Sequence, residues 1–154
     1  MKSKLIIIFV VGFSVSLACV LAVHFSDQPL DPIMYEGGKY IGPAVGLLNG
    51  YGYSEYNFGE YKPELERLPV YPFLIYITYW ISGQDNNLCL AIMQCVMVGL
   101  IAVVSSLAAY ALRPQWMLIT GLLTALTPAI FYRASIIMPG VQFTLFVTCG
   151  IAAV

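Results

Sequence analysis

The chain has 154 residues, of which 60% are apolar and 10% are charged, and its formal net charge is −1 at pH 7. This composition lies far from that of soluble globular domains. The near-neutral charge favours neither nucleic-acid binding nor a polybasic membrane anchor. We therefore expect an all-α integral membrane protein.

Long uncharged apolar runs indicate where the chain crosses the bilayer. A helix needs about 20 residues to span about 30 Å of hydrocarbon. About five transmembrane helices are predicted, and the shortest must tilt little, thin the bilayer or lie partly in the interface. The predicted spans are Leu5–Phe25, Leu68–Gly83, Leu88–Leu112, Pro114–Tyr132 and Ala134–Val154.

The N-terminal run predicts a retained anchor. Leu5–Val23 is longer than the roughly 7–15 apolar residues of a cleavable signal peptide. Lys2 and Lys4 precede it, and the positive-inside rule places such residues in the cytoplasm. We expect a plasma (inner) membrane protein with a cytoplasmic N-terminus.

The segment 26–67 then forms one large extracytoplasmic loop. It is too long and too polar for a connector between two spans. The loop holds most of the acidic residues of the chain: Asp27, Asp31, Glu36, Glu55, Glu60, Glu64 and Glu66.

Three structural predictions concern this loop. Apolar residues from Tyr40 to Leu48 have helical spacing, which predicts a short helix at the membrane surface that ends near Gly50. Ser54–Glu66 alternates aromatic and acidic residues and is predicted to be ordered but irregular. Leu68–Pro72 contains two prolines and is predicted to enter the next span in an extended conformation.

Cysteine and histidine offer no metal or disulfide pattern. The four cysteines, Cys19, Cys89, Cys95 and Cys149, all lie in predicted spans, where cysteine packs as a small apolar residue. The single histidine, His24, lies at a span boundary without ligand spacing to other residues. No cofactor is expected, although the sequence leaves the assistance of a divalent cation open.

Three motifs in a fixed order carry a family resemblance. They read Glu-Gly-Gly-Lys-Tyr-Ile-Gly-Pro-Ala at 36–44, Leu-Leu-Asn-Gly-Tyr-Gly-Tyr-Ser at 47–54 and Arg-Leu-Pro-Val-Tyr-Pro at 67–72. Their order and spacing resemble the membrane glycosyltransferases of the GT-C superfamily, especially bacterial relatives of protein O-mannosyltransferases and of the lipid A aminoarabinose transferase. Because such enzymes are much longer, the chain is expected to be the N-terminal part of a longer protein.

The resemblance implies transfer of a sugar, with inversion, from a polyprenyl-phosphate-linked donor to an acceptor at the extracytoplasmic face. The expected partners are membrane lipid, this donor and a glycan, lipid or protein acceptor that the sequence does not identify. A nucleic-acid partner is not expected.

The same resemblance implies roles for individual residues. Glu36 occupies the position of the family's catalytic Asp, and Asp31 is the second candidate because it repeats the acid-x-x-x-Tyr spacing. Such a base works best when a partly apolar setting raises its pKa toward neutrality. Arg67 is expected to bind the lipid phosphate with support from Lys62 or Lys39, because guanidinium binds phosphate bidentately.

Tyr40 and Tyr53 are the further candidate substrate-binding residues. Arg67 could instead anchor the chain by reaching lipid headgroups, and tyrosines are common at any membrane interface. Gln94 and Gln142 lie within predicted spans, where polar side chains commonly bridge neighbouring helices.

Two other functions compete with the transferase. The chain could be a noncatalytic membrane subunit or an inactive fragment of such an enzyme, which fits its short length. A transporter segment would combine broken helices with charges inside the membrane. Pro128 and Pro139–Gly140 offer such breaks, but charges are missing from the better supported predicted spans.

Overall fold

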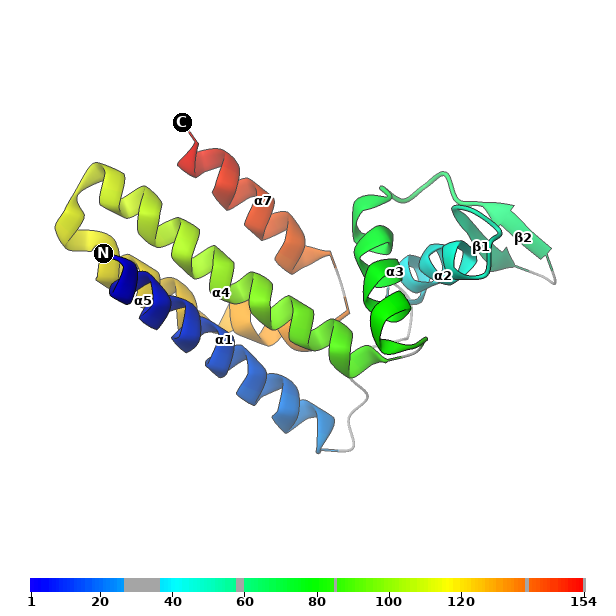
Figure 1. The fold of residues 1–154 in the computed structure, drawn as a ribbon, viewed down its shortest axis with the longest axis horizontal. Coiled ribbons are helices and arrows are strands. Elements are labelled where there is room, and N and C mark those ends of the chain that lie inside the picture. Colours follow the sequence, from blue (N-terminus) through cyan, green and yellow to red (C-terminus); the bar gives the residue numbers. More distant parts are fainter. Residues whose placement is uncertain (27–36, 58–59, 85, 138, 154) are drawn as a thin grey trace.

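The computed structural model describes residues 1–26, 37–57, 60–84, 86–137 and 139–153. Most of these residues are helical (Figure 1). The elements are α1 (Lys2–His24), α2 (Gly37–Leu48), β1 (Ser54–Asn57), β2 (Glu60–Pro63), α3 (Val70–Ser82), α4 (Asn87–Leu112), η1 (Pro114–Trp116), α5 (Met117–Ala125), α6 (Pro128–Phe131), η2 (Tyr132–Ser135) and α7 (Gly140–Ala152).

The described elements form a helical bundle and a smaller lobe (Figure 1). Helices α1, α4, α5 and α7 run side by side in the bundle. The lobe consists of α2, the β1–β2 hairpin and α3, and it lies at the end of the bundle opposite to Met1. The described residues of the hydrophilic segment between α1 and α3 are thereby gathered mostly at one end of the molecule.

Small residues let α1 and α4 pack closely. A Cβ added at Gly12 of α1 would lie 3.3 Å from the Cα of Gly99 in α4. The hydroxyl of Ser16 donates to the carbonyl of Gly12 at 2.8 Å, so this polar group is satisfied within its own helix. Close approach at small residues is the usual way in which helices associate in lipid.

Two of the predicted spans are present as single helices that are long and apolar enough to cross a membrane. These helices are α1, with 23 residues, and α4, with 26. Asn86 begins α4, because its side-chain oxygen accepts a hydrogen bond from the N–H of Cys89 at 3.1 Å.

The predicted span Pro114–Tyr132 is bent. The segments Pro114–Ala125 and Pro128–Ser135 meet at 52°, and together they count as a third span only if the bend is accepted within it. Thr127 has φ −71° and ψ 114°, because a following proline disfavours the helical conformation. The proline also lacks the N–H that would continue the helix.

The predicted spans Leu68–Gly83 and Ala134–Val154 each contain a helix of only 13 residues, α3 and α7 respectively. Such a helix is about 20 Å long, which is shorter than the hydrocarbon core of a bilayer. Ile136 is extended, and α7 begins only after Pro139, so the second run is divided. Neither run is confirmed as a span.

The lobe has its own apolar core, which also joins it to the bundle. Tyr71, Ile75 and Tyr79 of α3 pack with Ala44 of α2 and with two residues outside the lobe, Leu90 of α4 and Ile137. The hydroxyl of Tyr79 donates to the side-chain oxygen of Asn87 at 2.7 Å. The position of the lobe is therefore determined by contacts with the start of α4.

The prediction of an irregular segment at Ser54–Glu66 is wrong, because β1 and β2 form an antiparallel hairpin. Glu55 faces Lys62 and Tyr56 faces Tyr61 in this pair. Alternation of side-chain types over a few residues is the pattern of a strand, and Gly59 lies between the two alternating stretches. The fold is mostly helical rather than all-α.

The predicted helix before Gly50 is confirmed as α2, and Gly50 has the expected positive φ of 79°. Gly42 and Gly46 lie inside this helix and face β1. A Cβ at Gly42 would lie 2.9 Å from the Cγ of Glu55, and one at Gly46 would overlap the carbonyl oxygen of Ser54. These glycines therefore allow the strand to lie directly against the helix.

Candidate functional site

The two predicted catalytic residues, Glu36 and Asp31, lie outside the described residues, as does Asp27. The structure describes the four predicted substrate-binding residues: Tyr40, Tyr53, Lys62 and Arg67. Tyr40 and Lys62 belong to the lobe, Tyr53 lies directly before β1, and Arg67 lies between β2 and α3.

The backbone of Arg67 is held by hydrogen bonds with the side chains of Tyr53 and Glu64. The hydroxyl of Tyr53 donates to the carbonyl oxygen of Arg67 at 2.8 Å. A carboxylate oxygen of Glu64 accepts from the N–H of Arg67 at 3.1 Å and from the N–H of Glu66 at 2.6 Å. Both peptide groups of Arg67 are thus fixed immediately before α3 begins.

The predicted extended entry into α3 is wrong at Pro69. This residue has φ −71° and ψ −13°, and α3 starts at the next residue. A proline fits the beginning of a helix because its fixed φ matches the helical value. Arg67 therefore lies shortly before the start of α3, in the segment that joins β2 to this helix.

A series of side-chain contacts through two tyrosines connects Arg67 with α4. The guanidinium carbon of Arg67 is 5.3 Å from the ring centroid of Tyr40, which is the geometry of a cation–π contact. The ring of Tyr40 meets that of Tyr71 edge to face at 5.5 Å. The Tyr71 hydroxyl accepts from the side-chain N–H of Gln94 in α4 at 2.7 Å.

Charged residues line a polar pocket of about 450 Å³ beside Arg67. Both signs of charge are present: the pocket is lined by Lys39, Lys62 and Arg67 together with Glu55, Glu64 and Glu66. Lys62 is therefore brought to Arg67 as the sequence suggests. Such a mixture of donors and acceptors suits a ligand with several hydroxyl groups.

Glu55 and Glu64 form a carboxyl pair in the polar pocket. Partial burial raises the pKa of Glu55 above its ordinary value, and the charge of Glu64 and a hydrogen bond with Glu64 raise it further. Lys39 and Arg67 act in the opposite direction. Burial also raises the pKa of Tyr53, with a contribution from Glu64, so its hydroxyl stays protonated as the donor to Arg67.

An apolar groove of about 500 Å³ lies on the other side of Arg67. Glu66 and Arg67 line both the groove and the polar pocket. The remaining lining is mostly apolar and comes from α2, the start of α3 and the start of α7: Tyr40, Leu68, Val70, Tyr71, Pro139, Gly140, Gln142, Phe143 and Phe146. Arg67 thus stands at the boundary between a polar and an apolar cavity.

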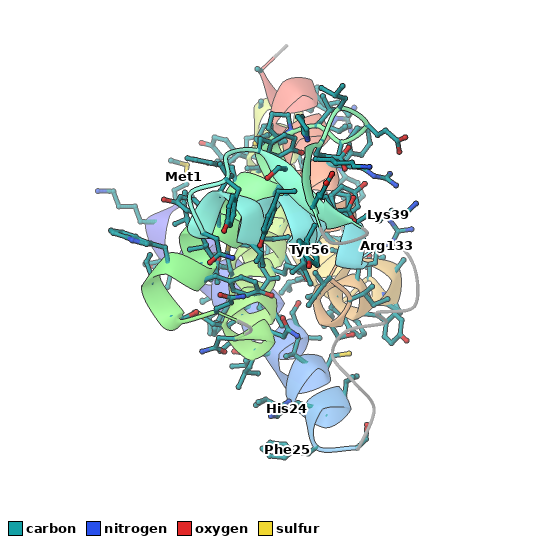
Figure 2. All side chains as sticks on the ribbon, turned by 90° about the vertical axis from the view of Figure 1, so that its right-hand side faces the viewer. Met1, His24, Phe25, Lys39, Tyr56 and Arg133 are labelled. Carbon is teal, nitrogen blue, oxygen red and sulfur yellow. The ribbon has the colours of Figure 1, made fainter. Side chains whose placement is uncertain are left out.

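Other aromatic residues of the lobe lie apart from this groove. Tyr51 and Tyr61 stack at 3.9 Å, and Tyr56 is tilted against Tyr61 at 5.2 Å. Figure 2 shows Lys39 and Tyr56 on the lobe, whereas His24 lies apart from them at the C-terminal end of α1. The only histidine of the chain is therefore not next to Lys39.

Within the described part of the chain, no group of three or more His, Cys, Asp or Glu side chains could hold a metal ion. The described site thus consists of ammonium, guanidinium, carboxyl, hydroxyl and amide groups. The participation of Asp31 and Glu36, which lie outside that part, stays a prediction.

Sequence reasoning missed the polar residues Glu55, Glu64, Glu66 and Gln142, which also line these cavities. The alternation around Gly59 could have indicated the hairpin and hence the pairing of Glu55 with Lys62. Gln142 was expected to bridge helices, and no local pattern indicates that it reaches the groove beside Arg67.

No protein-family model, curated protein or solved structure matches the sequence.

Proposed function

We propose that this chain forms the donor-binding part of a membrane glycosyltransferase that takes a sugar from a polyprenyl-phosphate carrier. The observation that carries the proposal is the position of Arg67 between the polar pocket and the apolar groove. The motif resemblance around residues 36–72 supports the same reaction class.

The two cavities match the parts of such a donor. The isoprenoid chain is apolar and suits the groove, where the exposed fractions of Phe143 and Phe146 are 69% and 57%. The phosphate carries the negative charge, which a guanidinium binds bidentately. The sugar is rich in hydroxyl groups and suits the charged lining of the polar pocket.

The transfer also needs a group that accepts the proton of the acceptor hydroxyl. Glu36 and Asp31 remain the proposed candidates for this base. Glu55 is a third carboxyl with suitable surroundings, because its raised pKa brings it closer to the operating pH. Together with Glu64, it lies in the pocket that we assign to the sugar.

Arg67→Ala tests the donor site directly. The protein in lipid nanodiscs is titrated with a short-chain polyprenyl phosphate, with the neutral polyprenol as the ligand control. We expect the wild type to prefer the phosphate. The variant should bind it at least about tenfold more weakly, because hydrogen bonds to charged groups contribute about 1.5–3 kcal/mol. Arg67→Lys should restore part of the affinity, since lysine keeps the charge but lacks the planar fork.

Arg113→Ala is the matched control, because Arg113 follows α4 at the end of the bundle opposite to the lobe. It should bind polyprenyl phosphate as the wild type does. Equal binding by Arg67→Ala and the wild type would show that Arg67 is only a membrane anchor. Binding without consumption of any polyprenyl-phosphate sugar in membranes would favour the noncatalytic subunit.

A further inference from the structure

Every exposed side chain of α3 is apolar. The exposed positions recur at intervals of three or four residues, so they lie along one face of the helix. These residues are Val70, Phe73, Ile77, Trp80 and Ile81, and the last two are 70% and 72% exposed. A continuous exposed apolar face of this kind marks contact with another protein or with a membrane.

The polar groups of α3 are turned toward the protein. Tyr71 and Tyr79 are buried, and each of their hydroxyls lies 2.7 Å from a side chain of α4, Gln94 and Asn87 respectively. A surface helix in water has the opposite arrangement, with its apolar residues inside and its polar residues outside. The outer face of α3 therefore has the character of a face that contacts lipid.

Helices α1 and α4 are antiparallel, which determines the side on which α3 begins and ends. Ile8 of α1 packs with Ala102 of α4, while Gly12, one turn later, approaches Gly99. Figure 1 shows the end of α1 and the start of α4 at the end of the bundle opposite to Met1. If both helices cross a membrane, the chain therefore leaves α1 and enters α4 on the same side.

This arrangement argues against a crossing by α3. One crossing between α1 and α4 would place the start of α4 on the wrong side, so a second would be needed. The other helix in the described part of this interval is α2, with 12 residues, and Gly42 on it contacts the carboxyl-bearing Glu55 of the hairpin. Helices of this length reach only about 18–20 Å, which is less than the hydrocarbon thickness.

Helix α3 lies at the level where α4 would leave the hydrocarbon. Its buried face contacts Asn87 and Leu90 in the first turns of α4. Tryptophan is enriched at this level of a membrane, which suits Trp80. Val70, at the start of the apolar face, also lines the apolar groove together with Phe143 of α7. The face of α3 and the groove are thus one continuous apolar surface.

We propose that α3 is an interfacial helix, which lies along the membrane surface and inserts its exposed face into the leaflet on the side of the lobe. The occupant of this face is lipid and not a second protein. The apolar groove then opens at Val70 into the same leaflet, so a lipid can enter it without passing through water. This inference does not depend on the reaction that the chain serves.

Spin labels at the two ends of the apolar face test the orientation of α3. Phe73→Cys and Ile81→Cys, eight positions apart, are labelled one at a time in nanodiscs in a background without the native cysteines. Accessibility to oxygen and to a water-soluble nickel complex gives the depth of each label. Both should lie at the same depth, about 5–10 Å into the boundary between headgroups and acyl chains. A crossing helix would separate their depths by about 12 Å.

Ile92→Cys and Leu100→Cys in α4 are the matched control, because these side chains are also exposed and eight positions apart. Their depths should differ by about 12 Å along a crossing helix. A similar difference between the two α3 labels would overturn the proposal, as would α3 labels that lie in water. Equal depths in α4 would overturn it too, because the crossing of α4 is its premise.

Tryptophan fluorescence provides a second measurement in which the native cysteines stay in place. Trp116→Phe leaves Trp80 as the only tryptophan of the chain. We expect lipids brominated near the headgroups to quench Trp80 more strongly than lipids brominated at the chain ends. Protection from both lipids would show that water or a protein covers this face and would overturn the proposal. Neither measurement uses polyprenyl phosphate, so such a failure leaves the proposed function to its own test.

Discussion

At the scale of residues, the polar pocket brings together a guanidinium group and a pair of carboxyl groups. The guanidinium of Arg67 lies over an aromatic ring at the edge of an apolar groove, where it stays available to an anion. The carboxyl of Glu55 is paired with that of Glu64, an arrangement that favours a shared proton. A cationic side chain and a protonatable acid thus lie in one polar pocket.

Glu55→Gln tests the carboxyl pair through stability. Because the folded protein raises the pKa of Glu55, it binds more protons than the unfolded chain between the ordinary and the raised pKa. Stability should therefore fall as the pH rises through this window. The variant cannot titrate at this position, so its thermal unfolding midpoint should decline less than that of the wild type from about pH 4 to about pH 7.

Glu60→Gln, on the facing strand, is the control for this measurement, because Glu60 is exposed and does not line the polar pocket. It should retain the pH dependence of the wild type. An unchanged pH dependence in Glu55→Gln would mean that the carboxyl pair does not couple to folding.

At the scale of elements, the close packing of α2 against β1 shapes the polar pocket. Gly42 and Gly46 lie on the face of α2 that contacts the strand, and Gly42 leaves room for the side chain of Glu55. Lys39, which lines the same pocket, is on this helix as well. A shift of the strand away from the helix would therefore move Glu55 away from Lys39 and change the lining of the pocket.

Gly46→Ala should lower stability despite the better helix propensity of alanine. Its Cβ would overlap the carbonyl oxygen of Ser54, and overpacking of this kind costs about 1–3 kcal/mol. Gly38→Ala, in the same helix, meets no atom within 4 Å and should gain up to about 1 kcal/mol. Chemical unfolding in detergent measures both, and equal stability of the two variants would contradict the packing described here.

At the scale of the whole molecule, the separation of the lobe from Met1 has a consequence for topology. α1 begins at one end of the bundle, and the lobe lies at the other (Figure 1). If the bundle crosses the membrane, Met1 and the lobe face opposite sides. Lys2 and Lys4, in the first turn of α1, then favour a cytoplasmic Met1 and an extracytoplasmic lobe.

Single cysteines test this orientation in a background without the four native cysteines. Leu65→Cys lies on the lobe, and Leu112→Cys at the end of α4 is the matched site on the opposite side; the native side chains are 90% and 86% exposed. An impermeant maleimide should label residue 65 in intact cells and residue 112 only after permeabilisation. The reverse pattern would place the lobe, and with it the proposed donor site, on the cytoplasmic face.

The sequence alone determined two helices that are long and apolar enough to cross a membrane, α1 and α4, and helix α2 with its glycine terminus. In these cases the information is local, because an uninterrupted apolar run or a helical spacing belongs to a single element. It also indicated Arg67 and Lys62 as neighbours in one loop. The number of complete spans was not determined, since hydropathy describes composition and does not report where backbone hydrogen bonding stops at Pro128 and Pro139.

Only the tertiary structure decided the surroundings of Arg67. Tyr40 comes from α2, Glu55 from the hairpin and Gln142 from α7, so their meeting depends on how the lobe docks on the bundle. The contacts of Tyr71 and Tyr79 with α4 produce that docking. A sequence pattern reports the faces of one element, whereas contacts between distant segments follow from shape and buried area that no single segment contains.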